Sequence, residues 1–387
     1  MSAVVRLPRP DGTVEERRLA GPADWPRPAR PLASRVAFAA AHVVADPLGD
    51  NTPGAPAAVD WEATLAFRRH LWSYGLGVAE AMDTAQRGMG LDWATTRELV
   101  ARSAAEARTV GGRIAAGAGT DHAPADLASL DDVTAAYAEQ IEVMEASGAQ
   151  VILMASRQLA RIARGPEDYA KVYGRLLDQV SRPVILHWLG PMFDPALHGY
   201  WGSPEVPAAT AALLDLIGRY RGRVDGVKVS LLDAEHERGL RAALPSGVRL
   251  YTGDDFHYPE LIRGDGVHHS DALLGVFAAI APAASAALQA LDAGDPARYD
   301  ALLAPTVPLA RHIFTAPTWY YKTGIAFLAW LCGHQPGFTM VGGLQSGRSV
   351  VHLAELARLA DDARLLPDPD LAAARLRAFL DVAGVSR

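Results

Sequence analysis

The sequence predicts a (β/α)8 barrel with an N-terminal arm and a C-terminal helical extension. The main observation is that eight short apolar runs alternate with helical patterns between Val36 and Ala293. Continuous apolar strands joined by helical crossovers are typical of a parallel sheet buried on both faces, and eight such units match a barrel. An open doubly wound sheet is the main alternative, but no Gly-x-Gly-x-x-Gly turn follows an early strand to support it.

The expected strands are apolar runs, most of them rich in β-branched residues, while the second is rich in small residues. Short apolar runs bounded by turn residues are typical of buried strands. In chain order the eight expected strands are Val36–Ala45, Gly75–Met82, Arg113–Gly117, Val151–Ala155, Pro183–Trp188, Val224–Ser230, Val248–Thr252 and Gly266–His269.

A helical pattern follows each run, and several of the helices have capping residues. Asp60 is placed to cap the first helix, and the pair Gly111-Gly112 ends the second. Ser129 and Asp132 form a capping-box pattern at the start of the third. The expected helices are Trp61–Ser73, Ala94–Val110, a segment from Ser129 to Gly148, Pro166–Val180, Glu205–Arg219, Ala234–Ala243, Tyr258–Arg263 and Leu273–Ala293.

Three regions follow from this pattern: an arm over 1–33, the barrel over 34–293 and the helical extension over 294–387. The arm is rich in Pro and Arg and lies outside the repeating units. Added helices of this kind are compatible with self-association, so a homo-oligomer is a candidate assembly. The helices expected in the extension are Ala297–Phe314, Trp319–Leu331, Val350–Ala363 and Leu371–Val382.

Composition excludes several classes of function. The 387 residues are 50% hydrophobic and 21% charged, which is enough apolar material for a large core. The net charge of −7 argues against general nucleic-acid binding. The single cysteine, Cys332, excludes a disulfide framework. Met1 to Ala20 has no apolar signal core, and the longest apolar run, Ile325 to Cys332, is too short to span a bilayer. We expect a cytoplasmic protein that binds neither nucleic acid nor membrane.

Lys228 is the first candidate for chemistry. Only Lys171, Lys228 and Lys322 among the 37 basic residues are lysines, and only lysine can lose its proton near neutral pH. Lys228 lies inside an apolar strand, where desolvation disfavours its charged form. Lowering its pKa by about 3 units requires roughly 4 kcal/mol of differential environment. The neutral amine would attack a carbonyl and form an imine. The alternative is a structural lysine paired with a carboxylate across the barrel.

His187 lies on strand 5, next to the strand that carries Lys228. Neighbouring strands are about 4.8 Å apart, so an imidazole at this position would be able to move protons for an imine on Lys228. The alternative is a hydrogen-bonded core histidine. The pair is more informative than either residue alone, because both side chains come from adjacent strands.

Further candidates follow other strands at the carboxyl end of the barrel, where barrel enzymes place their active sites. Thr84 and Arg157 are candidates for holding an anionic or hydroxylated end of a substrate, and Asp254 and His268 for orienting the rest. The patch Trp319-Tyr320-Tyr321 lines either the site or an oligomer interface.

A metal site is the alternative reading of this end of the barrel. Carboxylates and imidazoles on adjacent strands commonly hold Zn²⁺ or Mn²⁺, although the spacing here matches no strong metal motif. The turn-like sequence Gly253-Asp254-Asp255 is equally typical of a local helix cap. The residues in question are Asp254, Asp255, His257, His268 and His269.

The segment from Val36 to Ala293 resembles the dihydrodipicolinate synthase and N-acetylneuraminate lyase superfamily of class I aldolases, and more narrowly a branch of unknown function within it. Lys228 stands where that superfamily has its imine-forming lysine. The matching stretches are Asp46-Pro47, Val59-Asp60-Trp61, Pro183-Val184-Ile185-Leu186-His187, Gly226-Val227-Lys228, Gly253-Asp254-Asp255 and Gly266-Val267.

The sequence departs from that pattern around the lysine. The superfamily's loop Gly-Thr-Thr-Gly-Glu is matched by Asp83-Thr84-Ala85-Gln86-Arg87, which keeps only Thr84. His187 stands where a relay tyrosine is common, and Arg157-Gln158 matches a tyrosine pair. The lysine is thus retained while its acid–base and carboxylate-binding partners differ.

The resemblance and the residues together predict an imine-forming lyase, aldolase or dehydratase that acts on a small 2-oxo acid or a sugar-derived ketone. Lys228 and His187 are the expected catalytic residues, and no cofactor or bound metal is expected. Two alternatives stay open: a metal-dependent barrel aldolase or isomerase, and a ligand-binding barrel without catalysis.

Overall fold

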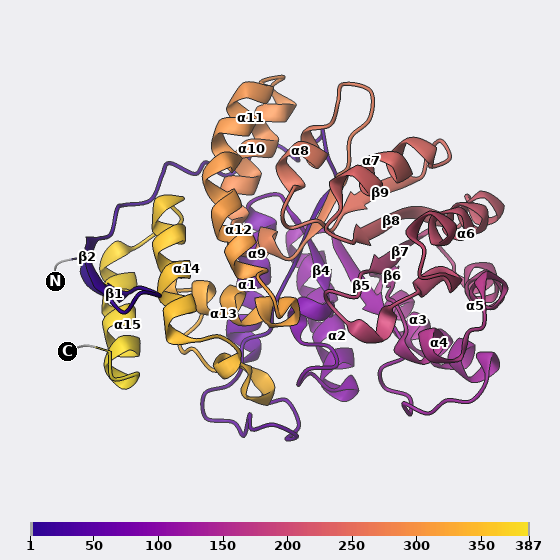
Figure 1. The fold of residues 1–387 in the computed structure, drawn as a ribbon, viewed down its shortest axis with the longest axis horizontal. Helices are drawn as coiled ribbons and strands as arrows, with labels where there is room; N and C mark the ends of the chain where they lie inside the picture. The colour runs from indigo at the N-terminus through magenta and orange to yellow at the C-terminus, as the bar shows by residue number, and fades with distance from the viewer. Residues whose placement is uncertain (1–2, 386–387) are drawn as a thin grey trace.

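The computed structural model describes residues 3–385 and contains a closed barrel of eight parallel strands (Figure 1). The strands follow one another around the barrel in chain order, and the last one closes it by pairing with the first and the seventh. The predicted fold class is confirmed. The barrel strands are β3 (Ala37–Ala40), β4 (Gly77–Glu80), β5 (Ile114–Ala118), β6 (Gln150–Leu153), β7 (Val184–Leu189), β8 (Val224–Ser230), β9 (Arg249–Thr252) and β10 (Asp271–Leu274).

Helices connect the strands and surround the barrel. The predicted caps are present: the side chain of Asp60 accepts the backbone N–H of Ala63, and that of Ser129 accepts the N–H of Asp132. The barrel helices are α1 (Trp61–Ser73), α2 (Trp93–Val110), α3 (Leu130–Ser147), α4 (Arg157–Ile162), α5 (Pro166–Gln179), α6 (Val206–Tyr220), α7 (Ala234–Ala243), α8 (Tyr258–Arg263), α9 (Val276–Ala279) and α10 (Ala281–Asp292).

The eighth strand is not where the sequence pattern predicted it. Residues 266–269 form an exposed turn, in which the side chain of Asp265 accepts the backbone N–H groups of Val267 and His268. Gly264 and Gly266 have positive φ there, which breaks any strand. The strand is instead the following run, β10, so the helix predicted from Leu273 begins only at α9.

The extension consists of α11 (Pro296–Leu303), α12 (Val307–Ile313), α13 (Tyr321–Leu331), α14 (Val350–Asp362) and α15 (Pro369–Val382). The single helix predicted over Ala297–Phe314 is wrong. A 3-10 turn over Ala304–Thr306 divides it, because Pro305 lacks an N–H and its ring clashes with the preceding helical turn. No helix among residues 3–385 has both the length and the hydropathy needed to cross a membrane.

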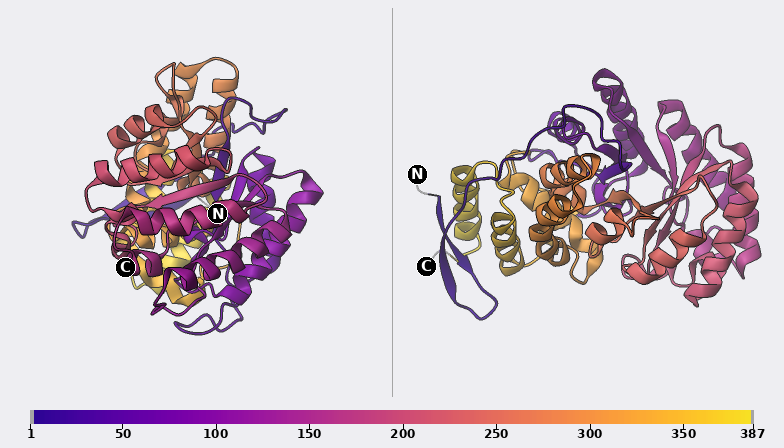
Figure 2. Two further views of the ribbon diagram at one scale, coloured as in Figure 1. Left: turned by 90° about the vertical axis from the view of Figure 1, so that its right-hand side faces the viewer. Right: turned by 90° about the horizontal axis from the view of Figure 1, so that it is seen from above.

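The N-terminal arm includes an antiparallel hairpin of β1 (Val4–Pro8) and β2 (Val14–Arg18). The hairpin lies against α14 and α15 at the end of the molecule farthest from the barrel (Figure 2). Val5 and Leu7 are buried there, and Arg17 forms an ion pair with Asp361 at 2.6 Å. The three-region division and self-association through the extension stay predictions.

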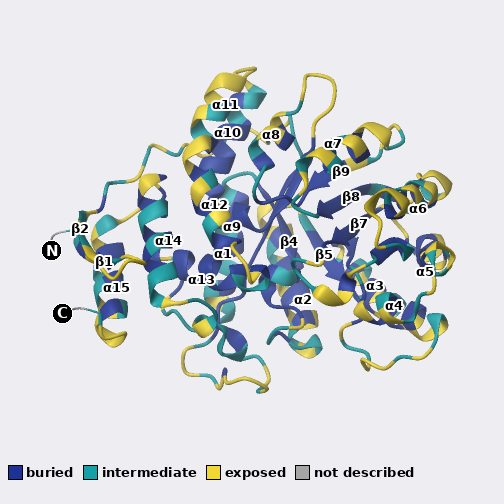
Figure 3. Ribbon diagram, viewed as in Figure 1, coloured by how far each residue is buried: buried dark blue, intermediate teal, exposed yellow. Residues whose placement is uncertain are grey.

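The barrel and the extension share one hydrophobic core. A single cluster of buried side chains runs from Phe67 of α1 and Val276 of α9 to Ile325 of α13, Leu356 of α14 and Leu376 of α15. In Figure 3 the dark-blue, buried parts of the ribbon include the barrel strands and stretches of the helices of the extension beside them. The extension therefore closes one side of the barrel rather than forming a separate unit around its own core.

The barrel interior is filled by a second, smaller cluster. It includes three alanines on the adjacent strands β3, β4 and β5, whose side chains take up little space in the barrel interior. Lys228 on β8 and His187 on β7 lie in the second halves of their strands, toward the carboxyl end of the barrel. The members of the cluster are Phe38, Ala40, Ala79, Met82, Ala115, Ile152, Met154, Ile185, Tyr251 and Leu273.

A buried ion pair joins α1 to β4. Arg68 donates to both carboxylate oxygens of Glu80, at 2.9 and 2.8 Å, and neither side chain is exposed. Arg68 also donates to the backbone oxygens of His42 and Thr64. This arrangement satisfies both charges in a region that excludes water.

We expect Arg68→Met to lower the free energy of unfolding by about 3–5 kcal/mol, because it leaves the Glu80 carboxylate buried without its partner. Chemical denaturation at neutral pH measures the loss. The double variant with Glu80→Met is the control, and it should recover most of the loss because it removes both charges. A loss below about 1 kcal/mol, typical of exposed pairs, would contradict this account.

Candidate active site

Lys228 lies near the carboxyl end of β8 with its side chain in the barrel interior. The strand register places it beside His187 of β7 and Tyr251 of β9. Only 8% of its surface is exposed. Gly253 follows β9 at a close approach: a Cβ at this position would lie 2.2 Å from Ser230 Oγ and 2.9 Å from Lys228 Cε. A glycine is therefore required for the lysine side chain to pass.

Two neighbouring hollows lie at this end of the barrel, and Lys228 borders the inner one. The inner one, of about 20 Å³, holds one water-sized group and is bordered by Lys228, Thr84, Asp255 and Tyr321 among others. The outer one is a cleft of about 680 Å³. Asp83 and Leu189 border both hollows. These two residues therefore separate the cleft from the hollow that contains the amine.

Lys228 has no ion-pair partner within the described residues 3–385. Burial lowers the pKa of its amine, and the nearby carboxylates of Asp83 and Asp255 act in the opposite direction. Asp255 is itself buried, which raises the pKa of its carboxyl group to about 8. One of its oxygens accepts the backbone N–H of Val276 at 2.8 Å. Burial thus favours the uncharged form of both groups.

Thr84 and Tyr321 form a hydroxyl pair in the inner hollow, with 2.8 Å between the threonine Oγ1 and the phenol oxygen. Tyr321 comes from α13 of the extension. Its ring stacks on Phe314 with centroids 4.4 Å apart, which fixes the position of the phenol. Burial raises the pKa of Tyr321 well above 10, so the phenol keeps its proton. The aromatic patch Trp319-Tyr320-Tyr321 was the only sequence signal for this residue.

His187 is fully buried and borders the outer cleft. Its Nε2 lies 3.3 Å from Ser230 Oγ, and its Nδ1 has no hydrogen-bond partner among the described residues. Burial, and then the charge of Lys228, lowers the pKa of the imidazole well below 6.5. At neutral pH His187 is therefore an uncharged ring beside the amine.

Arg157 lies at the rim of the outer cleft, as the first residue of α4. Its side chain is 57% exposed and forms an ion pair with Asp194 of the loop after β7. The structure thus brings Lys228, His187, Thr84 and Arg157 to the same end of the barrel, on four different segments of the chain.

Asp254 and His268 do not border either hollow. The carboxylate of Asp254 caps the turn after β9: it accepts the backbone N–H groups of Phe256 and His257 and contacts His257 Nδ1 at 3.0 Å. His268 is exposed in the loop that leads into β10, at the amino end of the barrel. The expectation that His268 orients a substrate at Lys228 is wrong, because it followed from the misplaced eighth strand.

The residues considered for a metal site do not converge. Asp254 and His257 contact each other, Asp255 lies near Lys228, and His268 and His269 are at the opposite end of the barrel. Within residues 3–385 no group of three or more His, Cys, Asp and Glu side chains is placed to hold a metal ion.

Comparison with solved structures relates the fold to one group of barrels. YagE from E. coli, a prophage protein of the dihydrodipicolinic acid synthase family solved with pyruvate, is 14% identical with a TM-score of 0.67, covering 86% of this chain and 99% of that one. The 4-hydroxy-tetrahydrodipicolinate synthase of Methylacidiphilum fumariolicum is 15% identical with a TM-score of 0.65. The match covers 89% of this chain and 98% of that one. Dihydrodipicolinate synthase from Aquifex aeolicus is 12% identical with a TM-score of 0.61. The match covers 91% of this chain and 98% of that one.

At these identities the likeness shows the shared fold. No curated protein sequence matches the chain. The model of one family does match, over residues 5–385. The chain therefore belongs to the family described as protein of unknown function (DUF993), and it has the barrel fold of the dihydrodipicolinate synthases.

Proposed function

We propose that this protein is an imine-forming lyase or aldolase in which Lys228 attacks the carbonyl group of a small 2-oxo acid or a sugar-derived ketone. The observation that carries the proposal is the buried amine itself: it has no ion-pair partner among residues 3–385 and borders a hollow that shares Asp83 and Leu189 with the neighbouring cleft. Burial lowers the pKa of this amine, and the unprotonated form of a lysine is a nucleophile for carbonyl groups.

In the proposed reaction, the unprotonated Nζ of Lys228 forms a bond to the carbonyl carbon while the carbonyl oxygen takes up a proton. That oxygen then leaves as water, and a protonated imine remains. The protonated imine accepts the electron pair of the neighbouring C–C bond as this bond breaks, and an enamine forms. In a dehydration it accepts the pair of a neighbouring C–H bond instead, and the enamine then expels the next oxygen, which keeps the C–O pair, takes up a proton and leaves as water. Each step moves a proton, so the site needs a group that donates and recovers one close to Nζ.

Tyr321 is better placed for this proton transfer than His187. The phenol borders the same inner hollow as Lys228, and its hydrogen bond to Thr84 Oγ1 offers a route for the proton. His187 borders the outer cleft, and burial suppresses its protonation. We assign Tyr321 and Thr84 to proton transfer, and His187 to ordering Ser230 and the ligand beside Lys228. Arg157 would contact the ligand at the rim.

The direct test is reduction with borohydride in the presence of candidate oxo acids and ketones, followed by mapping of the modified peptide by mass spectrometry. We expect a covalent adduct on Lys228, and none in Lys228→Arg, because a guanidinium does not lose its proton. A ligand that binds without forming an adduct would instead support a non-catalytic barrel. An adduct on another residue would overturn the assignment.

Substitution of the proton-transfer residues separates their roles. We expect Tyr321→Phe to reduce the rate of hydrogen–deuterium exchange on the ligand carbon next to the carbonyl by about 10²-fold or more, the usual contribution of a positioned acid or base. NMR measures the exchange. Borohydride trapping at saturating ligand should persist. His187→Asn is the matched comparison, and a larger loss of exchange in His187→Asn than in Tyr321→Phe would reverse the assignment.

The pH dependence of trapping reports on the Lys228 amine. Only the neutral amine attacks, so the trapping rate should rise with pH, with a midpoint below the ordinary lysine value of 10.5 because burial lowers this pKa. The Asp255 carboxylate acts to raise the pKa, so Asp255→Asn should move the midpoint to lower pH. Asp215→Asn is the control, because Asp215 is exposed on α6 and its partner Arg219 is exposed as well. A midpoint that moves to higher pH in Asp255→Asn would contradict this account.

A further inference from the structure

Lys322 is a second buried lysine that the proposed reaction does not use. It follows Tyr321 in α13, and only 2% of its surface is exposed. Among the described residues, its Nζ has one hydrogen-bond contact, to the thioether Sδ of Met89 at 3.2 Å. It also lies 5.2 Å from the centre of the Tyr321 ring. A thioether is a weak acceptor, so this amine lacks the oxygen partners that buried ammonium groups normally have.

The electrostatic neighbours of Lys322 all border the outer cleft. They are Asp83, Arg157 and Asp194, from three separate segments. Neither of the two carboxylates, Asp83 and Asp194, forms an ion pair with the Lys322 Nζ. Asp194 is instead paired with Arg157. The loop carrying Met89 also approaches Arg157, whose Nη1 lies 3.7 Å from where a Cβ on Gly88 would be. Lys322 itself borders neither hollow, but the residues that act on its charge and the loop at Met89 relate it to the part of the cleft where Arg157 lies.

Burial lowers the pKa of the Lys322 amine to about 8, and the carboxylates of Asp83 and Asp194 act in the opposite direction. The ammonium form therefore still predominates at pH 7. A buried cation without an oxygen partner is suited to bind an anion, since a charge-assisted hydrogen bond is stronger than one to sulfur.

We propose that Lys322, together with Arg157 at the rim, binds an anionic group of the substrate that is distinct from the carbonyl group attacked by Lys228. The anion, a carboxylate or a phosphate, displaces the Met89 thioether from Nζ. This inference rests on the proposed function for the position of the carbonyl. It narrows the substrate class to ketones or oxo acids that carry a distal anionic group.

The backbone explains why one ligand would meet both lysines. Tyr321 and Lys322 are consecutive residues, with Cα atoms about 3.8 Å apart. Tyr321 borders the hollow of Lys228, whereas Lys322 contacts the loop at Met89. The carboxylate of Asp83 acts to raise the pKa of both lysines, so it is near both amines. The inferred ligand places its carbonyl group at Lys228 and its anionic group toward Lys322.

The test compares ligands that differ only in the distal anion. Borohydride trapping at Lys228 is titrated with 2-oxoglutarate against 2-oxovalerate, and with dihydroxyacetone phosphate against dihydroxyacetone. We expect one anionic ligand to reach half-saturation at a concentration at least tenfold lower than its neutral-ended partner. The pair that shows the preference identifies the group as a carboxylate or a phosphate. Equal half-saturation within both pairs would overturn the inference.

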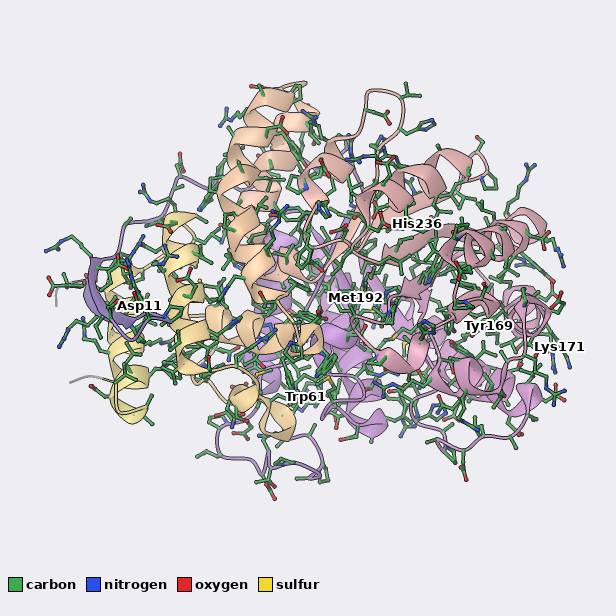
Figure 4. The ribbon with its side chains drawn as sticks, viewed as in Figure 1. Asp11, Trp61, Tyr169, Lys171, Met192 and His236 are labelled. Atoms are coloured by element: carbon green, nitrogen blue, oxygen red, sulfur yellow. The ribbon has the colours of Figure 1, made fainter. Side chains whose placement is uncertain are left out.

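Lys322→Met should abolish this preference and leave the half-saturation by 2-oxovalerate and dihydroxyacetone unchanged. A merely structural lysine would affect both members of a pair alike, and that result would also overturn the inference. Lys171→Met is the matched control, because Lys171 is the remaining lysine and is exposed at the outer edge of α5 (Figure 4). Thermal unfolding checks the fold, and Lys322→Gln serves as a second variant if the methionine destabilises it.

A second measurement needs no imine. Calorimetry with glutarate and with inorganic phosphate should detect binding of one of them to the wild type and to Lys228→Ala, and no binding to Lys322→Met. If this pattern holds while no ketone is trapped at Lys228, the proposed function fails and the anion site stands. If ketones are trapped but neither anion binds in a Lys322-dependent manner, the proposed function stands and the anion site is excluded.

Discussion

The free-energy cost of a charge inside an apolar barrel governs the protonation of Lys228, on which the proposed reaction depends. The amine of Lys228 is buried beside the apolar side chains that fill the barrel interior. No carboxylate among the described residues forms an ion pair with it. An ammonium ion there loses hydration without full compensation, so burial favours the neutral amine. Asp255 is subject to the same cost, and the pKa of its carboxyl group rises to about 8 for this reason. The site therefore contains two groups whose charges are both disfavoured, which is the condition under which a lysine becomes a nucleophile.

The helical extension completes the site as well as the core. Its helix α13 contacts the short helical turn Asp83–Ala85 after β4, and it contributes Tyr321 to the inner hollow. The same helix places Lys322 next to the loop at Met89. Because Ile325 of α13 belongs to the cluster that includes Phe67 of α1, the packing that stabilises the extension also holds these side chains in place. A change that loosens α13 would thus affect the site and the stability together.

The buried cations of the chain divide into two kinds. The buried arginines, Arg68, Arg87 and Arg241, each have a carboxylate partner, namely Glu80, Asp121 and Asp265. Such pairs are structural, since both charges are compensated. The buried lysines, Lys228 and Lys322, have no such partner among residues 3–385 and lie at the carboxyl end of the barrel. An uncompensated cation costs stability. Lys228 borders the inner hollow, and Lys322 is near three residues that border the outer cleft, namely Asp83, Arg157 and Asp194.

Local pattern alone was sufficient for the barrel, for most of its helices and for the position of Lys228, because strand and helix periodicity and caps such as Asp60 depend on neighbours in sequence. It placed the eighth strand too early, since the short apolar stretch at Val267 was read as a strand although its glycines and Asp265 form a turn. That error carried His268 to the wrong end of the barrel. Asp255 follows the strand next to β8 and was already a candidate at this end of the barrel. Tyr321 could not be inferred from spacing, because it approaches Lys228 only when a helix nearly a hundred residues away packs against the barrel. Contacts between segments so distant in sequence depend on packing, which no local pattern encodes.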